Sequence, residues 1–425
     1  MATDRPSLRG HLPHGVQDLF LSEASRRRQA EAVLRDLFAR WAYRELIPPT
    51  FEYEDTLVIG AGSDLRQAMY RFFDREGHTL ALRADFTTQV ARMAATKLLD
   101  QPLPLRCFYI GSVFRYEEPQ VGHQREFTQA GVELIGASTP AADAEVVALA
   151  AAALEALDVP NFQIILGQMA LFRALTAGLR ADDLERIRAA IDQRNPFRLQ
   201  KALDAAGMTG SQRALLASLP ERIGGPEVLE EALAFGGAVA SAAEALAEVY
   251  RLLDAYGIAG RVILDLGEVR GMDYYTGITF RGVAPGLGWP LLSGGRYDEL
   301  LGQFGRPLAA VGFGLGIERA LLAQAPQTCF APSLAPHLVV QGCIHPPCLS
   351  LVRRLRQAGY RVEVDVLGRQ GADLRAYAHS QGCRRTLHCT GDSGPQGPLW
   401  QFSDERGERT VTGDQLWEEA KKWND

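Results

Sequence analysis

The chain has 425 residues and a formal net charge of −6, with 47% hydrophobic and 23% charged residues. This length favours two or three domains of ordinary globular composition. No apolar run reaches the roughly 18–20 residues of a membrane span, the N-terminal residues lack the apolar stretch of a signal peptide, and no basic stripe marks a duplex binder, so we expect a cytoplasmic protein without a membrane partner.

The first predicted element is an amphipathic helix from about Ser22 to Trp41, whose apolar residues recur at helical spacing. Ser22 is the expected N-cap, and the acidic Glu23 suits the first turn. The Pro48-Pro49 pair then ends regular structure. Beyond it, the pattern predicts strands at residues 70–74 and 79–83 and a helix at residues 88–99.

The middle of the chain alternates β-rich and helical segments. Residues 105–116 and 126–136 are predicted strands, and an alanine-rich helix follows at residues 142–157. The almost wholly helical pattern of residues 170–256 predicts a helical insertion between two β-rich regions. Further predicted elements are strands at 261–266 and 274–280, a helix after Gly294-Gly295, and a strand followed by a helix within 309–323.

Prolines in residues 326–336 predict a linker between a core, residues 1–325, and a small α/β domain, residues 337–425. In the small domain we expect strands at residues 337–341 and 361–366 and helices at 347–358 and 372–380. The sequence therefore predicts an α+β protein with a helical insertion and a separate C-terminal domain.

Cysteines gather near the C-terminus. Cys343, His345 and Cys348 are close enough in sequence to suggest metal ligands, with His388 and Cys389 as a second half. However, prolines fill the gap between His345 and Cys348, and the paired CxxC spacing of a zinc ribbon is absent. We therefore expect reduced, partly buried thiols, no metal and no cofactor.

Two segments in the first half combine polar residues that suggest a binding site. Asp85 or Thr87 could cap the helix that follows, or the Asp85 carboxylate could hold an ammonium group. Gln129 and Glu133 are an even number of positions apart and so share one face of a strand. Arg115 lies near the preceding turn, where arginine and glutamate either form a solvated cross-strand pair or recognise a phosphate and an amine.

Two segments in the second half are rich in tyrosine and glycine. Tyr274 and Tyr275 are adjacent in a predicted strand, so at most one should line a given pocket, and β-propensity explains the pair as well as ligand contact does. The alternate glycines of Gly312-Phe313-Gly314-Leu315-Gly316 keep one strand face bare, either for a flat ligand or for tight packing. Arg319 follows at the start of the next predicted helix.

Together these segments resemble the histidyl-tRNA synthetase family. Phe114-Arg115-Tyr116-Glu117 is similar to class II motif 2, and Gly312 to Arg319 is similar to motif 3. The two histidine-specific signatures resemble Arg270-Gly271-Met272-Asp273-Tyr274-Tyr275 and Ser293-Gly294-Gly295-Arg296-Tyr297-Asp298. The resemblance covers nearly the whole chain. It implies a class II aminoacyl-tRNA synthetase-like antiparallel sheet of six strands flanked by helices, an anticodon-binding-like C-terminal domain, and a dimer formed through the first helix.

The resemblance also assigns roles to residues. In a synthetase the arginine matching Arg115 holds the ATP α-phosphate, the one matching Arg319 holds the γ-phosphate, and the one matching Arg270 stabilises the activation transition state. Carboxylates neutralise the α-ammonium group of histidine, while polar side chains recognise the imidazole nitrogens. The implied histidine site consists of Asp85, Thr87, Gln129, Glu133, Arg270, Tyr274 and Tyr275, with Arg115 and Arg319 as a vestigial ATP site.

The motif 2 loop departs from the charging enzymes. Glu118 and His123 both stand where those enzymes carry arginine. Replacing arginine by glutamate changes the charge by two units, each worth on the order of 3 kcal/mol at about 5 Å and an effective dielectric near 20. Even one third of that for both units would weaken phosphate binding more than about tenfold. The loop therefore no longer suits tRNA.

Other stretches, Leu12 to Leu19, Asp85 to Arg92 and Glu126 to Gly136, resemble the synthetase-related regulatory subunits of ATP phosphoribosyltransferase. This resemblance implies a non-catalytic homodimer that joins a short-form catalytic subunit in a hetero-octamer. Such a subunit gives the first step of histidine biosynthesis its activity and its feedback by L-histidine. Arg270 and Arg319 also fit two alternatives, a histidyl-tRNA synthetase and another histidine-adenylating paralogue.

Overall fold

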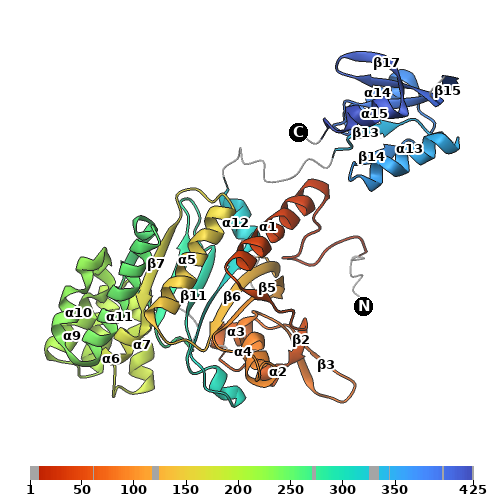
Figure 1. Ribbon diagram of the computed structural model, residues 1–425. Coiled ribbons are helices and arrows are strands. Elements are labelled where there is room, and N and C mark those ends of the chain that lie inside the picture. The colour runs from red at the N-terminus through yellow and green to blue at the C-terminus, as the bar shows by residue number, and fades with distance from the viewer. Residues whose placement is uncertain are drawn as a thin grey trace, which may run out of the picture. The chain divides into compact units, whose positions relative to one another are not determined.

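The computed structural model describes residues 9–60, 62–116, 124–269, 274–324, 335–343, 345–394 and 397–423. The chain divides into two compact units, Met1–Ala331 and Pro332–Asp425. Each unit contains its own β-structure (Figure 1). Within the ranges just given, no helix is long and apolar enough to cross a membrane.

A nine-stranded sheet, counted over the described residues, forms the centre of the first unit. The six strands from β5 to β7 each run antiparallel to their neighbours, as the family resemblance implies. At the two sides, β1 is parallel to β5 and β9 is parallel to β7. In order across the sheet the strands are β1 (Arg44–Glu45), β5 (Leu105–Phe114), β6 (Glu126–Ile135), β12 (Ala310–Gly316), β11 (Leu292–Arg296), β10 (Ile278–Val283), β7 (Gln163–Gln168), β9 (Val262–Asp265) and β8 (Ile223–Gly224).

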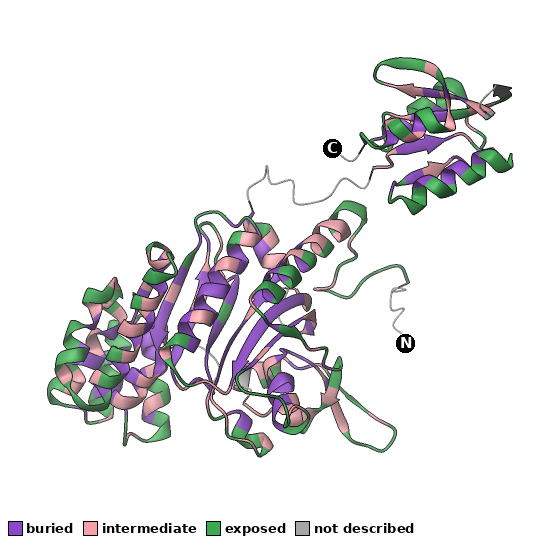
Figure 2. Ribbon diagram, viewed as in Figure 1, coloured by how far each residue is buried: buried purple, intermediate pink, exposed green. Residues whose placement is uncertain are grey.

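Both faces of this sheet are covered. Alternate residues of β5 enter different hydrophobic clusters: Phe108 packs in the cluster that includes α1 (Leu21–Arg40) and α5 (Pro140–Ala156), whereas Tyr109 packs with α4 (Thr87–Thr96). Because side chains alternate across a strand, burial of both sets means that neither face is left to solvent. Figure 2 shows this as buried strands between partly exposed helices.

Helix α5 contacts β6, β10, β11 and β12, and it runs across the sheet in Figure 1. Its alanines bring the helix backbone close to the strands, so that little of the helix is left exposed. Thr139 caps the helix by accepting a hydrogen bond from the Ala142 N–H at 3.4 Å, and Pro140 occupies the first turn, where no intrahelical N–H is needed. Helix α12 (Ile317–Ala323) continues directly from β12 and contacts both β6 and α1.

The insertion between β7 and β9 is mostly helical, as its pattern indicates, but Ile223–Gly224 form the short strand β8 inside it. Its buried leucines and alanines belong to the same hydrophobic cluster as one face of the sheet, so the insertion extends the core. Its helices are α6 (Met169–Leu175), α7 (Ala181–Asp192), α8 (Pro196–Ala205), α9 (Gly210–Ser218), α10 (Glu230–Phe235) and α11 (Gly237–Ala255), with 3-10 turns at η1 (Leu219–Glu221), η2 (Pro226–Leu229) and η3 (Ala259–Arg261).

A separate three-stranded sheet lies before β5 in the chain. It has the order β2-β4-β3, and α4 follows it. The predicted strands near residues 70–74 and 79–83 are β3 (Arg71–Phe73) and β4 (Thr79–Leu82), while β2 (Phe51–Tyr53), α2 (Glu54–Leu57) and α3 (Ser63–Gln67) were not predicted. A further 3-10 turn, η4 (Leu301–Phe304), contacts α4.

Three local predictions are wrong. Helix α1 begins one residue earlier than expected, with Phe20 and not Ser22 at the N-cap position. Gly294-Gly295 lie within β11 and do not lead a helix, because residues without side chains here let neighbouring strands approach closely. The strand expected at residues 274–280 begins only at Ile278, which leaves the tyrosine pair outside it.

The second unit contains a five-stranded sheet with the order β14-β13-β15-β16-β17. The predicted strands and helices at residues 337–380 are present, whereas the strands of residues 386–412 and the last helix were not predicted. The elements are β13 (Leu338–Val340), α13 (Pro346–Gln357), β14 (Val362–Val364), α14 (Gly371–Ser380), β15 (Thr386–Gly394), β16 (Gly397–Asp404), β17 (Gly407–Thr412) and α15 (Gly413–Ala420).

Candidate functional site

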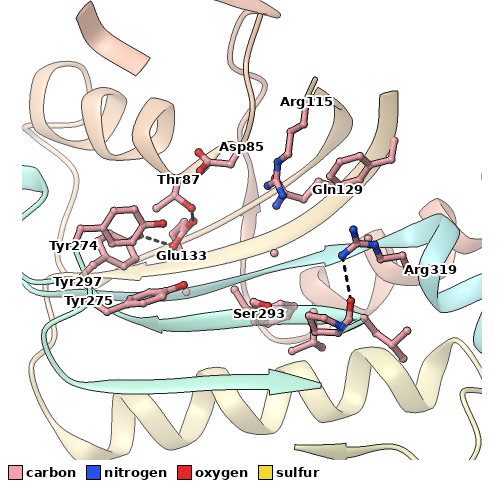
Figure 3. A pocket seen from close by; sticks show the side chains of 18 residues that line it. Asp85, Thr87, Arg115, Gln129, Glu133, Tyr274, Tyr275, Ser293, Tyr297 and Arg319 are labelled. Atoms are coloured by element: carbon pink, nitrogen blue, oxygen red, sulfur yellow. Dashed lines mark hydrogen bonds between the residues drawn. The ribbon is translucent and has the colours of Figure 1, made fainter. Parts of the chain in front are cut away.

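A cavity of about 240 Å³ opens on the α4 side of the central sheet. Its walls come from the start of α4, from β6, β11, β12 and α12, and from the segments that follow β5 and precede β10. Every candidate site residue that the structure describes lines it, namely Asp85, Thr87, Arg115, Gln129, Glu133, Tyr274, Tyr275 and Arg319 (Figure 3). The sequence pattern therefore pointed to residues that the fold brings together.

Two parts of the prediction lie outside the described residues. Arg270 belongs to residues 270–273, and both Glu118 and His123 belong to residues 117–123. The charge reversal in the motif 2 loop is therefore inferred from the sequence alone.

The alternate glycines of β12 make room for the polar floor of the cavity. A β-carbon at Gly312 would overlap the carboxylate of Glu133, and one at Gly314 would overlap the side-chain amide of Gln129. The bare strand face expected from the glycine pattern is thus covered by these two side chains from the neighbouring strand β6.

Glu133 is the centre of a buried hydrogen-bond network. Its Oε1 accepts from Thr87 Oγ1 at 2.9 Å and from the Tyr109 hydroxyl at 3.3 Å, and its Oε2 accepts from the Tyr297 hydroxyl. Burial nevertheless raises the pKa of Glu133 to about 8, because desolvation outweighs the three hydroxyl donors and Asp85 adds a second negative charge nearby. At neutral pH this group holds either its own proton or a cationic partner.

Asp85 is the second buried carboxylate of the cavity. Burial raises its pKa, whereas the Arg115 guanidinium and the backbone N–H groups of Thr88 and Thr87 oppose the rise. Those N–H groups belong to the first turn of α4, so Asp85 caps the N-terminus of this helix. It also lines the cavity, so the two interpretations of this residue are compatible. Thr87 donates its hydroxyl to Glu133 and not to the helix backbone.

Gln129 leaves an acceptor unused. The side chain is buried, and its Oε1 accepts no hydrogen bond from any residue that the structure describes. A buried amide oxygen without a donor costs free energy of about 1–3 kcal/mol. Gln129 and Asp85 both line the cavity, so a ligand N–H or ammonium group is a candidate partner for this oxygen.

Two arginines lie at the other end of the cavity from the tyrosines (Figure 3). Arg115 Nε donates to the Ala84 carbonyl at 2.9 Å, and Arg319 Nη1 donates to the Pro290 carbonyl at 3.3 Å. Their guanidinium carbons lie 5.3 Å and 5.9 Å from the centre of the Phe127 ring. This end of the cavity therefore favours an anionic group.

Tyr274 and Tyr275 both line the cavity, which contradicts the expectation that at most one would. The reason is that they precede β10, so the alternation of a strand does not separate them. Their rings pack edge to face with centroids 5.1 Å apart, and Tyr274 packs likewise on Tyr297. A β-carbon at Gly295 would come within 2.8 Å of the Tyr275 ring, so the glycine of β11 is needed for this arrangement.

The set of predicted site residues omitted several described residues that line the cavity, among them Tyr297, Ser293 and Phe127. Tyr297 and Ser293 lie in the second histidine-specific signature, which was recognised as a motif without a role for either side chain. Phe127 lies between the two arginines and was not singled out. The contact between Tyr297 and the Glu133 carboxylate depends on the strand order, in which β11 and β6 lie on either side of β12. Residue spacing does not reveal that order.

Comparisons with known proteins agree with the motifs. The family model described as Histidyl-tRNA synthetase matches residues 15–320. The ATP phosphoribosyltransferase regulatory subunit of Symbiobacterium thermophilum is 42% identical over 388 residues, which are 90% of this chain and 97% of that protein. The protein of the same name from Moorella thermoacetica is 43% identical over 376 residues, 87% of this chain and 96% of its own.

Solved structures share the fold. An ATP phosphoribosyltransferase regulatory subunit/histidyl-tRNA synthetase from Bacillus halodurans has a TM-score of 0.79 at 29% identity and covers 91% of this chain and 99% of its own. A histidyl-tRNA synthetase from a Nostoc species has a TM-score of 0.78 at 21% identity, covers 97% and 99%, and shows likeness of fold alone. The resemblance read from the motifs is confirmed: the chain belongs to the family of ATP phosphoribosyltransferase regulatory subunits, which is built on the class II fold of histidyl-tRNA synthetase.

Proposed function

We propose that this chain is the regulatory subunit of a cytoplasmic ATP phosphoribosyltransferase, that it performs no chemistry itself, and that L-histidine binds in the cavity as the effector. The observation that carries the ligand assignment is that two buried carboxylates, Asp85 and Glu133, and two arginines line one cavity, with Glu133 at the tyrosine end and Asp85 near Arg115. Histidine presents two groups that can be cationic, the α-ammonium and the imidazole, and one carboxylate. The charges of ligand and cavity are therefore complementary.

The size of the cavity supports an amino acid. Its volume of about 240 Å³ is below the roughly 300–1,000 Å³ of pockets that hold drug-sized molecules. A ligand as large as ATP would need the space beyond Phe127 in addition. The cavity is thus large enough for a single amino acid.

The contacts suggest an orientation for histidine. The Glu133 end is lined by tyrosines, so it suits the flat aromatic imidazole ring, whose N–H can bond the carboxylate. The α-ammonium group fits beside Asp85 and the unused Oε1 of Gln129. The α-carboxylate then points toward Arg115, which would bind it through charge-assisted hydrogen bonds.

The proposed partner is a short-form catalytic subunit that transfers a phosphoribosyl group, a glycosyltransferase reaction, within a hetero-octamer. The names of the relatives support a catalytic partner. Histidine acts by binding more tightly to one conformational state of the complex than to the other. Linkage then requires the partner or its substrates to change the histidine affinity by the same factor.

One observation favours a second function. Arg115 and Arg319, which in a synthetase hold ATP, both line the cavity. A histidyl-tRNA synthetase, or a paralogue that adenylates histidine for another acceptor, would keep them for this purpose. Histidine-dependent exchange of pyrophosphate into ATP, lost in Arg270→Ala, would establish that function in place of the regulatory one.

The assembly can be tested by mixing. The chain and a short-form catalytic subunit should elute together in size-exclusion chromatography, with a mass by light scattering that contains both subunits in equal number. Separate elution of two monodisperse proteins at micromolar concentration would remove the regulatory proposal. A long-form transferase, which carries its own regulatory domain, is the matched control and should elute alone.

A further inference from the structure

Three cysteines of the second unit converge although 46 positions separate the first from the last. Cys343 follows β13, Cys348 lies on α13 and Cys389 lies on β15. Their sulfur atoms all lie within 4.8 Å of one another, and no other residue within the described ranges offers a metal-ligand atom to this group. Cys348 is buried, while Cys343 and Cys389 pack against the same hydrophobic cluster and are partly exposed, so two of the thiols are accessible from solvent.

The backbone around the cluster supplies hydrogen-bond donors to sulfur. The His345 N–H donates to Cys343 Sγ at 3.4 Å, and the Gly391 N–H donates to the Cys389 sulfur. In both cases the donor is two residues after the cysteine. Gly391 has a φ of +79°, which glycine adopts without strain, so the turn that aims this N–H depends on that residue. Donors of this kind stabilise a thiolate over a thiol.

A buried donor above the cluster remains unsatisfied. The indole Nε1–H of Trp400 makes no hydrogen bond of ordinary geometry to any described residue. The indole nevertheless lies close to the sulfur of Cys348. A thiolate is a stronger acceptor than a thiol, so metal-bound sulfur would satisfy this donor better than the free side chain does.

The two histidines near the cysteines do not complete the group. Neither histidine ring belongs to the group of described ligand atoms that lie within 4.8 Å of one another, and His345 contributes only its backbone N–H, to Cys343. A disulfide between any two of the cysteines would leave the third thiol in place, and all three are free. What remains is a set of three soft sulfur ligands with partial access to solvent.

We propose that Cys343, Cys348 and Cys389 bind one Zn²⁺ ion as thiolates, with water in the fourth position. Each thiol gives up its proton on binding, so three protons leave for each ion bound. Tetrahedral Zn–S bonds of about 2.3 Å place sulfurs about 3.8 Å apart, which the cluster reaches by side-chain adjustments of about 1 Å. The ion ties α13 to β13 and β15 and thereby fixes the second unit.

This site was discounted at the sequence level because CxxC pairs are absent. The fold supplies the third ligand from β15, and the pairing of β13 with β15 cannot be read from residue spacing. His345 and His388, which the spacing also suggested as ligands, do not belong to the cluster.

The test uses the full chain without an affinity tag and Zn²⁺ alone as the ligand. The metal-loaded chain should retain one Zn²⁺ after gel filtration, and zinc should protect three of the six cysteines from a thiol reagent. Co²⁺ in place of zinc should give the intense thiolate charge-transfer and visible bands of a tetrahedral site. Cys343→Ser and Cys389→Ser, both at partly exposed positions, should weaken zinc binding by about a hundredfold or more.

Cys383→Ser is the matched control, because Cys383 is a buried cysteine of the same unit whose Sγ donates to the Arg385 carbonyl at 3.2 Å, a bond that serine can make. This variant should bind zinc like the parent chain. Binding that survives unchanged in both Cys343→Ser and Cys389→Ser would overturn the proposal. So would failure of the reduced parent chain to compete with a chromogenic chelator for zinc, or a disulfide between two of the three cysteines in freshly purified protein.

Discussion

Gly312 and Glu133 face each other across strands β12 and β6, and the carboxylate of Glu133 occupies the space that a β-carbon at Gly312 would need. Only glycine at position 312 leaves room for the buried Glu133 carboxylate to line the cavity, where it can bind a ligand. The glycine motif and the polar floor of the cavity are two parts of one arrangement.

The variant Gly312→Ala should therefore lose histidine binding while the fold is kept. Over-packing of this kind costs about 1–3 kcal/mol, so the affinity should fall roughly ten- to a hundredfold as Glu133 is displaced. Isothermal titration calorimetry with histidine measures the loss, and circular dichroism checks the fold. Gly260→Ala, at a position with no atom within 4 Å of the added carbon, should bind as the parent does. Equal affinity in both variants would place histidine elsewhere.

The histidine affinity should show a plateau between about pH 6.5 and 8. Free imidazole has a pKa near 6.5, and the pKa of Glu133 is raised to about 8 by burial. In the proposed complex the imidazole of the bound histidine and the carboxylate of Glu133 share one proton. Binding must then release a proton below this window and take one up above it, so the affinity falls up to about tenfold per pH unit on either side. An affinity that keeps rising through pH 8 would show that Glu133 holds a permanent cation instead. Glu133→Gln should lose the alkaline fall.

The unliganded chain should become less stable as pH rises, because of the same carboxylate. The pKa of Glu133 moves from 4.5 in the unfolded chain to about 8 in the folded one. Its contribution to stability is fully present below about pH 4.5 and is lost as pH rises toward 8. The melting temperature of Glu133→Gln relative to the parent should increase from pH 5 to pH 8, as measured by differential scanning fluorimetry. Glu248→Gln, at an exposed carboxylate whose pKa is lowered by Arg251, should show no such increase.

Tyr297→Phe removes the hydroxyl that donates to Glu133 Oε2. Without this donor the ionised form of Glu133 is less favourable, so its pKa should rise and the alkaline fall in affinity should begin at a higher pH. A lost hydrogen bond of about 1.4 kcal/mol weakens histidine binding about tenfold at pH 7.5. Tyr256→Phe, which removes a hydroxyl from a half-exposed ring stacked on Trp41, is the control and should change neither quantity. A loss of affinity with an unchanged pH profile would mean that Tyr297 only fills space.

The fold was largely predictable because its main elements carry regular patterns. The apolar strands β5 and β6 and the alanine-rich α5 are long, and their periods are unambiguous. The failures have physical causes. Glycines in β11 remove the side chains from which a strand is recognised. Strand β17 has a single buried residue, Val411, and so lacks a strong apolar face.

The site was predictable by motif but not by geometry. Spacing alone placed Gln129 and Glu133 on one face of a strand, and both do line the cavity. It could not show that Tyr274 and Tyr275 precede their strand, or that Tyr297 reaches Glu133 across the sheet. Contacts between distant segments depend on strand order, and the spacing of residues along the chain does not predict strand order.

The central claim, that histidine in this cavity regulates a partner enzyme, is tested most directly with the reconstituted complex. A short-form catalytic subunit is assayed for phosphoribosyl transfer to ATP alone, with this chain, and with this chain plus increasing histidine, using both the parent and Gly312→Ala. We predict activity only when the subunits are mixed, inhibition by histidine with the parent, and inhibition shifted at least about tenfold higher with Gly312→Ala. Equal inhibition of both complexes, or efficient charging of tRNA with histidine by the chain alone, would contradict the account.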